Sequence, residues 1–253
     1  MIFLKKPLII LTGPTAVGKT KLSISLAKAV NGAIISADSM QVYRHMDIGS
    51  AKIRPEEMCG VPHYLIDVLD PSEEFHVVKF VELAHEAMEK IYAAGQIPIV
   101  TGGTGFYIQA LLKEVDFTES HGELPIRKQL EEKAATEEGA AELYRELSEV
   151  DPASAETIHP NNVKRVIRAL EYYHETGQKI SEHNEEQKQK ESPYCSAYFV
   201  LNDERSILYD RIDRRVDQMI CDGLVDEVFR LKEMGYTRDL VSMQGLGYKE
   251  LFP

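Results

Sequence analysis

The sequence has few cysteines, no long apolar run and a shortage of basic residues. Its three cysteines, Cys59, Cys195 and Cys221, lack the spacing of metal ligands, and their odd number argues against a disulfide framework. The cysteines therefore favour a reducing, cytoplasmic location. No apolar run is long enough to cross a bilayer, so we expect no membrane partner. With 29 Lys and Arg against 41 Asp and Glu, the net charge of −12 argues against indiscriminate nucleic-acid binding but permits a local basic groove.

One stretch organises the chain, because residues 13–20 fit G-x-x-x-x-G-K-[ST], the phosphate-binding P-loop. The apolar run 7–12 predicts a buried strand before it, and residues 21–30 carry one apolar helical face after it. A strand, a glycine loop and a helix N-terminus in that order form an anion site. The alternative is a glycine-rich turn that arose by chance, but such a turn would not be expected to have both the strand and the helix beside it. The expected phosphate-binding residues are Gly13, Pro14, Thr15, Ala16, Val17, Gly18, Lys19 and Thr20.

Two side chains of this loop have predicted roles. Lys19 would reach the outer phosphates, and the hydroxyl of Thr20 would be a ligand of Mg²⁺. The motif indicates a diphosphate or a triphosphate without distinguishing between them.

A second predicted strand, 33–37, places Asp38 at its carboxyl end. Ligands of doubly wound sheets gather at that edge, so the stretch Asp38–Tyr43 is a candidate site. On position alone, a loop turn or a helix N-cap is an alternative role for Asp38.

A further predicted strand, 96–101, runs into Gly102-Gly103-Thr104-Gly105 and a helix that continues to Leu112. A glycine turn at a helix N-terminus offers a second anion contact, although glycines there can also serve only close packing of the helix. Beside a P-loop in the same sheet, we favour Thr104 as a hydroxyl on the phosphate side.

Two elements are predicted between these strands. Residues 64–68 indicate a short strand, and Glu74–Ala94 a helix with a core-facing apolar stripe that Gly95 ends. His76 and His85 on that helix are interpreted as bystanders.

From Glu123 to Lys190 the sequence is charged and helical, and a strand follows at 194–201. Helices are expected from Leu124 onward and at 140–150 and 161–176, with a polar, mobile stretch at 181–192. A helical block between strands indicates an insertion in an α/β domain.

The predicted fold class is therefore α/β, with a P-loop NTPase-like parallel sheet, helices on both faces and an inserted all-helical subdomain. The expected core comprises residues 1–116 and 193–253, and the expected insertion residues 117–192.

The predicted helix 204–221 carries Arg211 and Arg215, which are four residues apart and share a face. Solvated pairing with neighbouring aspartates would contribute little energy, whereas arginines that return toward a P-loop can clamp phosphates. The residues alone leave both interpretations open. Another helix is expected at 224–234, and a last one begins at 242–250.

The chain resembles the tRNA dimethylallyltransferases, also called isopentenyl-pyrophosphate:tRNA transferases, from Leu8 to Glu250. The specific part is the run Asp38–Tyr43 combined with Gly102–Gly105, since many enzymes share a P-loop. The other matching stretches are 46–52, 62–67, 161–171 and 247–250. The departures from the family's usual Thr, Gln, Ala and Ile are Ser50, Lys164, Gly245 and Leu246.

The resemblance implies transfer of a dimethylallyl group from dimethylallyl diphosphate to N6 of the adenosine 3′-adjacent to a tRNA anticodon. The leaving diphosphate would be stabilised by the P-loop with Lys19, by Mg²⁺ on Thr20, and by Thr104 and Arg215, with Arg211 as an alternate clamp. Asp38 would accept the N6 proton, and Ser39, Met40 and Gln41 would hold the flipped adenine.

The inserted helices would grip the anticodon stem-loop of the tRNA through phosphates. The expected tRNA contacts are Asp38, Ser39, Met40, Gln41, Thr104, Arg127, Lys164, Arg165, Val166, Ile167 and Arg168. We expect the protein to be a monomer.

Two other functions compete with this one. A small-molecule or nucleoside kinase would bind ATP and use Asp38 to activate a hydroxyl, but it requires neither the Asp38–Tyr43 run nor the helical insertion. A nucleotide-gated binding module would lack turnover, and the absence of an N-K-x-D signature counts against a GTP switch. No apolar strand after the P-loop ends in a clear second Mg²⁺ acid of the NTPase kind, since the strand 97–101 runs into Gly102-Gly103 instead.

Overall fold

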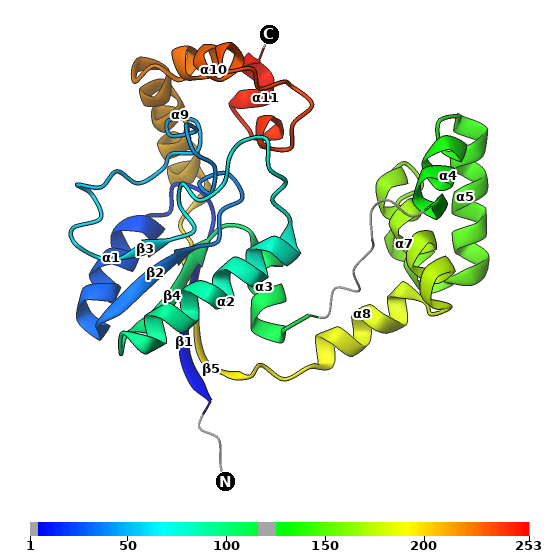
Figure 1. The fold of residues 1–253 in the computed structure, drawn as a ribbon, viewed down its shortest axis with the longest axis horizontal. Helices are drawn as coiled ribbons and strands as arrows, with labels where there is room; N and C mark the ends of the chain where they lie inside the picture. Colours follow the sequence, from blue (N-terminus) through cyan, green and yellow to red (C-terminus); the bar gives the residue numbers. More distant parts are fainter. Residues whose placement is uncertain (1–4, 116–124, 253) are drawn as a thin grey trace. The chain divides into compact units, whose positions relative to one another are not determined.

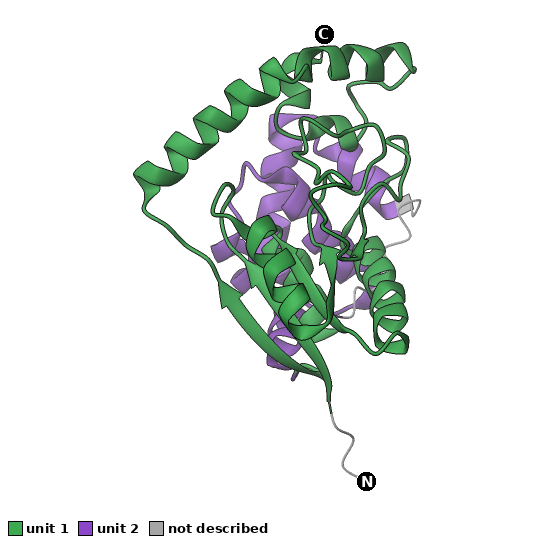
Figure 2. Cartoon of the chain, turned by 90° about the vertical axis from the view of Figure 1, so that its left-hand side faces the viewer, with its two compact units in different colours: residues 1–114, 192–253 green, residues 115–191 purple. Residues whose placement is uncertain are grey.

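The computed structural model describes residues 5–115 and 125–252, which form two compact units. One unit comprises residues 1–114 and 192–253, and the other residues 115–191 (Figure 2). The predicted boundary after residue 116 lies outside the described residues.

The first unit is built on a five-stranded sheet in the order β3-β2-β4-β1-β5, and every neighbouring pair is parallel (Figure 1). A parallel sheet brings the carboxyl ends of all its strands to one edge. The strands are β1 (Lys6–Thr12), β2 (Gly32–Ser36), β3 (His63–Tyr64), β4 (Ile97–Gly102) and β5 (Tyr194–Val200).

Helices cover both faces of this sheet, which confirms the predicted α/β class (Figure 1). Side chains alternate along a strand, so Ile34 of β2 packs against Ala27 of α1 (Lys19–Val30). The next residue, Ile35, joins the core on the other face with Phe80 of α2 (Val77–Ala93) and with α3 (Gly105–Lys113).

The predicted strand 64–68 is wrong beyond Tyr64. Leu65 and Asp67 have φ values of 61° and 56°, a left-handed conformation that no strand adopts. His76 also has a structural role, because its ring accepts a hydrogen bond from the backbone N–H of Lys79 and caps α2.

The C-terminal part of the first unit is helical. It contains α9 (Arg205–Cys221), α10 (Leu224–Glu233), a 3₁₀ turn η1 (Ser242–Gln244) and α11 (Tyr248–Leu251). The single helix predicted to begin at 242 is interrupted, because Gly245 is extended and Gly247 has a φ of 91°.

The second unit is all-helical, with a core that includes Leu143, Leu147 and Leu170. Its helices are α4 (Pro125–Lys133), α5 (Glu137–Val150), α6 (Pro152–Thr157), α7 (Val163–Thr176) and α8 (Ile180–Gln189). Leu124, the predicted start of the first of these helices, lies outside the described residues.

The stretch predicted to be mobile, 181–192, instead falls mostly within α8. Ser181 fixes the start of this helix, because its backbone N–H and its hydroxyl donate to the buried carboxylate of Asp151 at 3.0 and 2.6 Å. Among the described residues of both units, no helix is both long and apolar enough to span a bilayer.

Candidate active site

Three of the predicted site segments meet at the carboxyl edge of the sheet. The P-loop follows β1, Asp38 follows β2, and the Gly102–Gly105 turn ends β4, which lies between those two strands. The close approach requires glycine, since a Cβ on Gly102 would lie 2.2 Å from the carbonyl oxygen of Ala37. A Cβ on Gly13 would likewise lie 2.4 Å from the carbonyl oxygen of Leu201.

The P-loop holds its lysine across its own backbone. Lys19 Nζ donates to the carbonyl oxygens of Gly13 and Pro14, at 2.7 Å each. The loop reaches this shape through left-handed residues, Ala16 at a φ of 64° and Gly18 at 96°. The ammonium group is therefore fixed beside the helix N-terminus, where an anion would bind.

Lys19, Arg215 and Asp38 share one electrostatic environment. Burial lowers the pKa of Lys19, the positive charge of Arg215 lowers it further, and the carboxylate of Asp38 opposes both effects. Burial likewise lowers the pKa of Arg215, and Asp38 again opposes the shift. Two half-buried cations thus stand near one carboxylate at the edge of the sheet.

The two candidate arginines of α9 differ in their surroundings. Arg211 pairs with Asp203 at 2.9 Å and donates to the carbonyl oxygen of Ala16 at 3.5 Å, so its partner is not one of the aspartates of its own helix. Arg215 lines a cavity together with Thr20. The cavity has a volume of about 1200 Å³ and is formed by α1, α9 and the segment 47–67.

Asp38 shapes the turn that follows β2. Its Oδ1 accepts the backbone N–H groups of Met40 at 2.8 Å and Gln41 at 3.3 Å, which is the turn role expected as an alternative. Its Oδ2 takes no hydrogen bond from the described part of the chain. One oxygen is therefore structural, and the other is available to a ligand.

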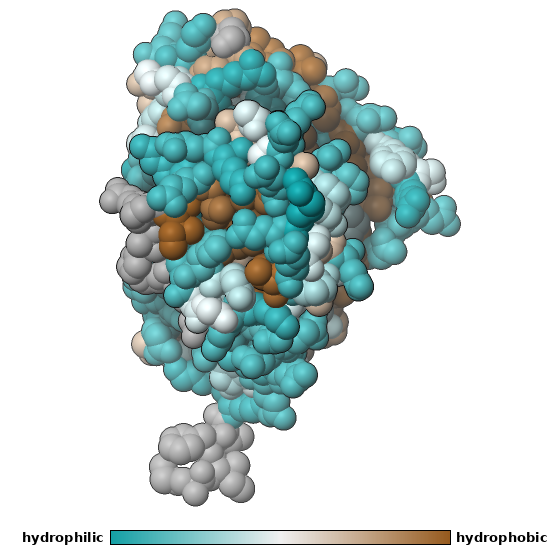
Figure 3. All heavy atoms as spheres, turned by 90° about the vertical axis from the view of Figure 1, so that its right-hand side faces the viewer, coloured by the Kyte–Doolittle hydropathy of each residue, from teal (hydrophilic) through white to brown (hydrophobic). Residues whose placement is uncertain are grey.

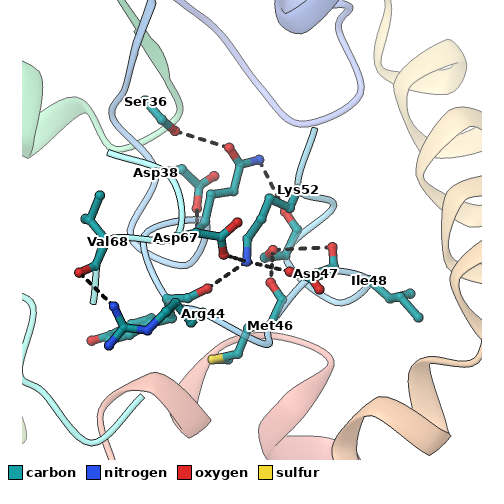
Figure 4. A network of polar contacts seen from close by, with 12 residues as sticks. Ser36, Asp38, Arg44, Met46, Asp47, Ile48, Lys52, Asp67 and Val68 are labelled. Carbon is teal, nitrogen blue, oxygen red and sulfur yellow. Dashed lines mark hydrogen bonds and ion pairs between the residues drawn. The ribbon is translucent and has the colours of Figure 1, made fainter. Parts of the chain in front are cut away.

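Met40 and Gln41, two of the predicted contacts of the adenine, pack against the protein itself. The side-chain amide of Gln41 accepts from the hydroxyl of Ser36 and donates to the carbonyl oxygens of Ser50 and Ala51 (Figure 4). A Cβ on Gly245 would lie 2.4 Å from the end of Met40, so the two residues are in close contact. Their contact with a base, like that of Ser39, stays a prediction.

Thr104 occupies the N-cap position of α3, and its half-buried side chain makes no capping hydrogen bond. The hydroxyl is therefore not committed to its own helix, in contrast to a usual N-cap threonine. Its role as a phosphate ligand stays a prediction.

Lys52 was not predicted as a site residue, although it ends one of the stretches that carry the family resemblance. Its side chain is 4% exposed and its Nζ bonds Asp47 at 2.6 Å, Asp67 at 2.5 Å and the carbonyl oxygen of Tyr43 at 2.7 Å (Figure 4). Lys52 and its partners Asp47 and Asp67 all line the cavity.

In the helical unit, two predicted RNA contacts converge on one buried carboxylate. Arg127 and Arg168 bond Oε2 of Glu171 at 3.4 and 2.9 Å, and the side chain of Glu171 is 0% exposed. Sequence reasoning missed Glu171, although its position three residues after Arg168 was a signal. Lys164 and Arg165 are exposed and form no ion pair within the described part of the chain.

Val166 and Ile167 are predicted RNA contacts whose side chains lie inside the helical unit, so their contact with RNA stays a prediction. They are only 1% and 5% exposed, because they form part of the core of the helical unit. Their contribution is to hold α7 in place. The face of the protein shown in Figure 3 is mainly hydrophilic, with small apolar patches.

The side chains that could serve as metal ligands limit how a metal ion would bind. Within the described residues, no group of three or more His, Cys, Asp or Glu side chains could hold a metal ion. The exposed Thr20, on the first turn of α1 and at the cavity, suits a Mg²⁺ ion whose other ligands are phosphate oxygens and water.

The five-stranded parallel sheet with helices on both faces defines an α/β protein with a P-loop-like fold. Residues 41–253 match the model of the IPP transferase family, and the chain belongs to that family.

Known relatives agree with this assignment. A tRNA dimethylallyltransferase of Lachnoclostridium phytofermentans is 66% identical over 98% of this chain and 79% of its own length. The crystal structure of a tRNA isopentenylpyrophosphate transferase from Bacillus halodurans is 46% identical, with a TM-score of 0.69 over 98% of this chain and 76% of that one. A eukaryotic dimethylallyltransferase, described as acting on tRNA, is 37% identical, with a TM-score of 0.85 over 98% of this chain and 63% of that one.

Proposed function

We propose that the protein transfers a dimethylallyl group from dimethylallyl diphosphate to N6 of the adenosine 3′-adjacent to a tRNA anticodon, releasing diphosphate. The observation that carries the proposal is the grouping of Lys19, Arg215 and Asp38 at the P-loop edge. The family and the names of the relatives support the same reaction.

The cations would act on the leaving group. As the allylic C–O bond breaks, negative charge grows on the diphosphate, and fixed positive charge in a partly desolvated site stabilises that transition state. Lys19 and the backbone N–H groups of the P-loop suit this role because the loop fixes the ammonium group in advance. Arg215 is the better candidate for the second clamp, since Arg211 is already paired with Asp203.

Thr20 would hold Mg²⁺ through its hydroxyl, while Thr104 would donate to a phosphate oxygen from the neighbouring strand end. The ion supplies positive charge to the diphosphate oxygens when bound. The chain's own residues position the substrate around it.

Asp38 would act on the acceptor. The N6 amine is a weak nucleophile because its lone pair is delocalised into the adenine ring, and its proton must leave as the new C–N bond forms. Oδ2 of Asp38 takes no hydrogen bond from the described residues and would accept this proton. Oδ1 keeps the carboxylate oriented through the turn.

The helical unit would supply affinity for tRNA. Lys164 and Arg165 are exposed on the first turn of α7, and Arg127 and Arg168 are held by Glu171. Such groups bind phosphates without reading sequence. We further propose that the protein acts in the cytoplasm and as a monomer.

A direct test uses unmodified tRNA, Mg²⁺ and dimethylallyl diphosphate, with mass spectrometry of the nucleosides. The proposal predicts one added prenyl group on adenosine with the wild type and none with Asp38→Ala. A parallel mixture with ATP alone tests the kinase alternative, which the relatives do not favour. Consumption of ATP without prenyl-adenosine would overturn the proposal.

A further inference from the structure

A buried carboxylate on α10 binds the backbone of a distant loop. Glu227 is 2% exposed, and its Oε2 accepts the N–H groups of Asp47 at 2.9 Å and Ile48 at 2.8 Å. Its Oε1 accepts the N–H of Gly49 at 3.1 Å and the hydroxyl of Tyr248 at 2.6 Å. Four donors on one buried anion compensate for its desolvation.

The same loop is clamped by the ring of Tyr248. A Cβ on Gly49 would lie 2.6 Å from ring atoms of Tyr248, so only glycine permits this approach. Residues 47–49 are therefore held by α10, through hydrogen bonds to Glu227, and by α11, through the ring of Tyr248.

The next two residues of this loop support the candidate catalytic turn. The carbonyl oxygens of Ser50 and Ala51 accept from the side-chain amide of Gln41 at 3.3 Å each. The backbone N–H of Gln41 in turn donates to Oδ1 of Asp38. A continuous set of contacts thus runs from Glu227 through the loop to Asp38, and part of it is visible in Figure 4.

The loop also forms part of the wall of the cavity described above. Asp47, Ile48 and Ala51 line the cavity that Thr20 and Arg215 line from the opposite elements. The side chain of Asp47 helps to hold the buried Lys52. A shift of the loop would therefore change both the shape of the cavity and the setting of Asp38.

We infer that Glu227 is a positioning residue for prenyl transfer: it fixes the loop 47–51, and through it Asp38 and Gln41, without lining the cavity itself. The inference rests on the proposed function. The P-loop does not depend on this support, because Lys19 is held by the carbonyl oxygens of Gly13 and Pro14. Loss of Glu227 should therefore impair the chemical step more than the binding of the diphosphate.

The test variant is Glu227→Gln, which keeps the size of the side chain but replaces one acceptor oxygen with a donor that faces backbone N–H groups. We expect kcat to fall about 10- to 100-fold, the cost of a displaced catalytic group. The KM for dimethylallyl diphosphate should change by less than about threefold, because the substitution leaves the contacts between the P-loop and the diphosphate unchanged.

A matched control separates positioning from general destabilisation. Val228→Ala shortens the adjacent buried side chain of α10, which belongs to the hydrophobic core and has no atom that could accept a hydrogen bond from the loop. Asp226→Asn changes an exposed acid on the same helix. Each variant is assayed at a temperature where thermal melting shows it fully folded, and both controls should keep kcat within about twofold of wild type.

Hydrogen exchange provides a readout independent of activity. In Glu227→Gln, a peptide containing residues 47–49 should lose protection at least about tenfold relative to wild type, and Val228→Ala should not show this local loss. If Glu227→Gln does not fold, Glu227→Asp, which keeps the charge but shortens its reach, takes its place in the same comparison.

The outcomes are distinct. Active wild type with an unchanged kcat in Glu227→Gln, or an equal loss in Val228→Ala, would overturn the positioning role. A wild-type enzyme that forms no prenyl-adenosine would instead contradict the proposed function, while the exchange experiment would still report whether Glu227 holds the loop.

Discussion

The two units of the protein hold their basic side chains in opposite ways. In the α/β unit, Lys19 and Arg215 are half-buried, and burial lowers the pKa of both. In the helical unit, Lys164 and Arg165 are exposed on α7, while Arg127 and Arg168 rest on the buried carboxylate of Glu171. Desolvated, fixed charges suit stabilisation of a transition state, whereas exposed charges suit salt-dependent affinity for phosphates.

This contrast has a simple consequence. Substitutions at the sheet edge should lower the rate of the chemical step and spare tRNA affinity. Substitutions on α7 should do the reverse.

The largest effect is expected at Asp38. Asp38→Asn keeps an oxygen that can accept the N–H of Met40 but cannot take a proton from N6, so kcat should fall about 10²- to 10⁴-fold. Single-turnover prenyl transfer and tRNA binding by filter retention measure the two quantities separately. A variant that keeps most of its kcat would show that Asp38 only shapes the turn.

Lys19→Ala should lower kcat about 10²- to 10³-fold, since one fixed cation is removed from the leaving-group site. In the wild type, burial lowers the pKa of Lys19 from its usual value of 10.5, so its charge, and with it the rate, should be lost as pH rises toward that value. Lys19→Arg should move this alkaline limb to higher pH. A limb that stays in place in Lys19→Arg would assign it to another group.

On the helical unit, Arg165→Ala combined with Arg168→Ala should weaken tRNA binding about tenfold and reduce the slope of log Kd against log salt by about one for each phosphate that is no longer neutralised. The kcat at saturating tRNA should remain near wild type. Lys128→Ala, at an exposed position on α4, is a control for net charge alone. If the slope of log Kd against log salt is unchanged in the double variant, other residues must bind the tRNA phosphates.

The smallest effect is expected at Gly245, where the family resemblance implies alanine. An added Cβ would lie 2.4 Å from the terminal methyl group of Met40, but that flexible end can move. Gly245→Ala should therefore reduce the free energy of unfolding by about 1 kcal/mol at most. Urea denaturation measures this change. A larger loss would mean that Met40 cannot rearrange.

Sequence patterns were sufficient for β1, β2, β4 and β5, because most residues of these strands are apolar and the P-loop marks the end of β1. They failed where backbone conformation decided the outcome. Leu65 and Asp67 adopt left-handed conformations that nothing in an apolar stretch signals. The polar composition of 181–192 also concealed α8, whose start is fixed by a side chain thirty residues away, Asp151.

The candidate site was predictable only in part, for a similar reason. Asp38 and Lys19 belong to local motifs, so their positions followed from the strands that precede them. Glu227 reaches residues 47–49 only through the packing of α10, and no local pattern reports that contact. Val166 and Ile167 lie in a basic stretch but face the core, because a helix turns neighbouring side chains to different sides.

The separation between a rate-determining sheet edge and a tRNA-binding α7 is tested most directly by two measurements made side by side. These are single-turnover prenyl transfer, with dimethylallyl diphosphate and saturating tRNA, and equilibrium binding of tRNA. Both are made on Asp38→Asn and on the Arg165→Ala and Arg168→Ala double variant. We predict that Asp38→Asn lowers the rate of prenyl transfer without changing the Kd for tRNA, while the double variant raises the Kd without changing the rate. A double variant that is slow at saturating tRNA, or an Asp38→Asn that fails to bind tRNA, would contradict this prediction.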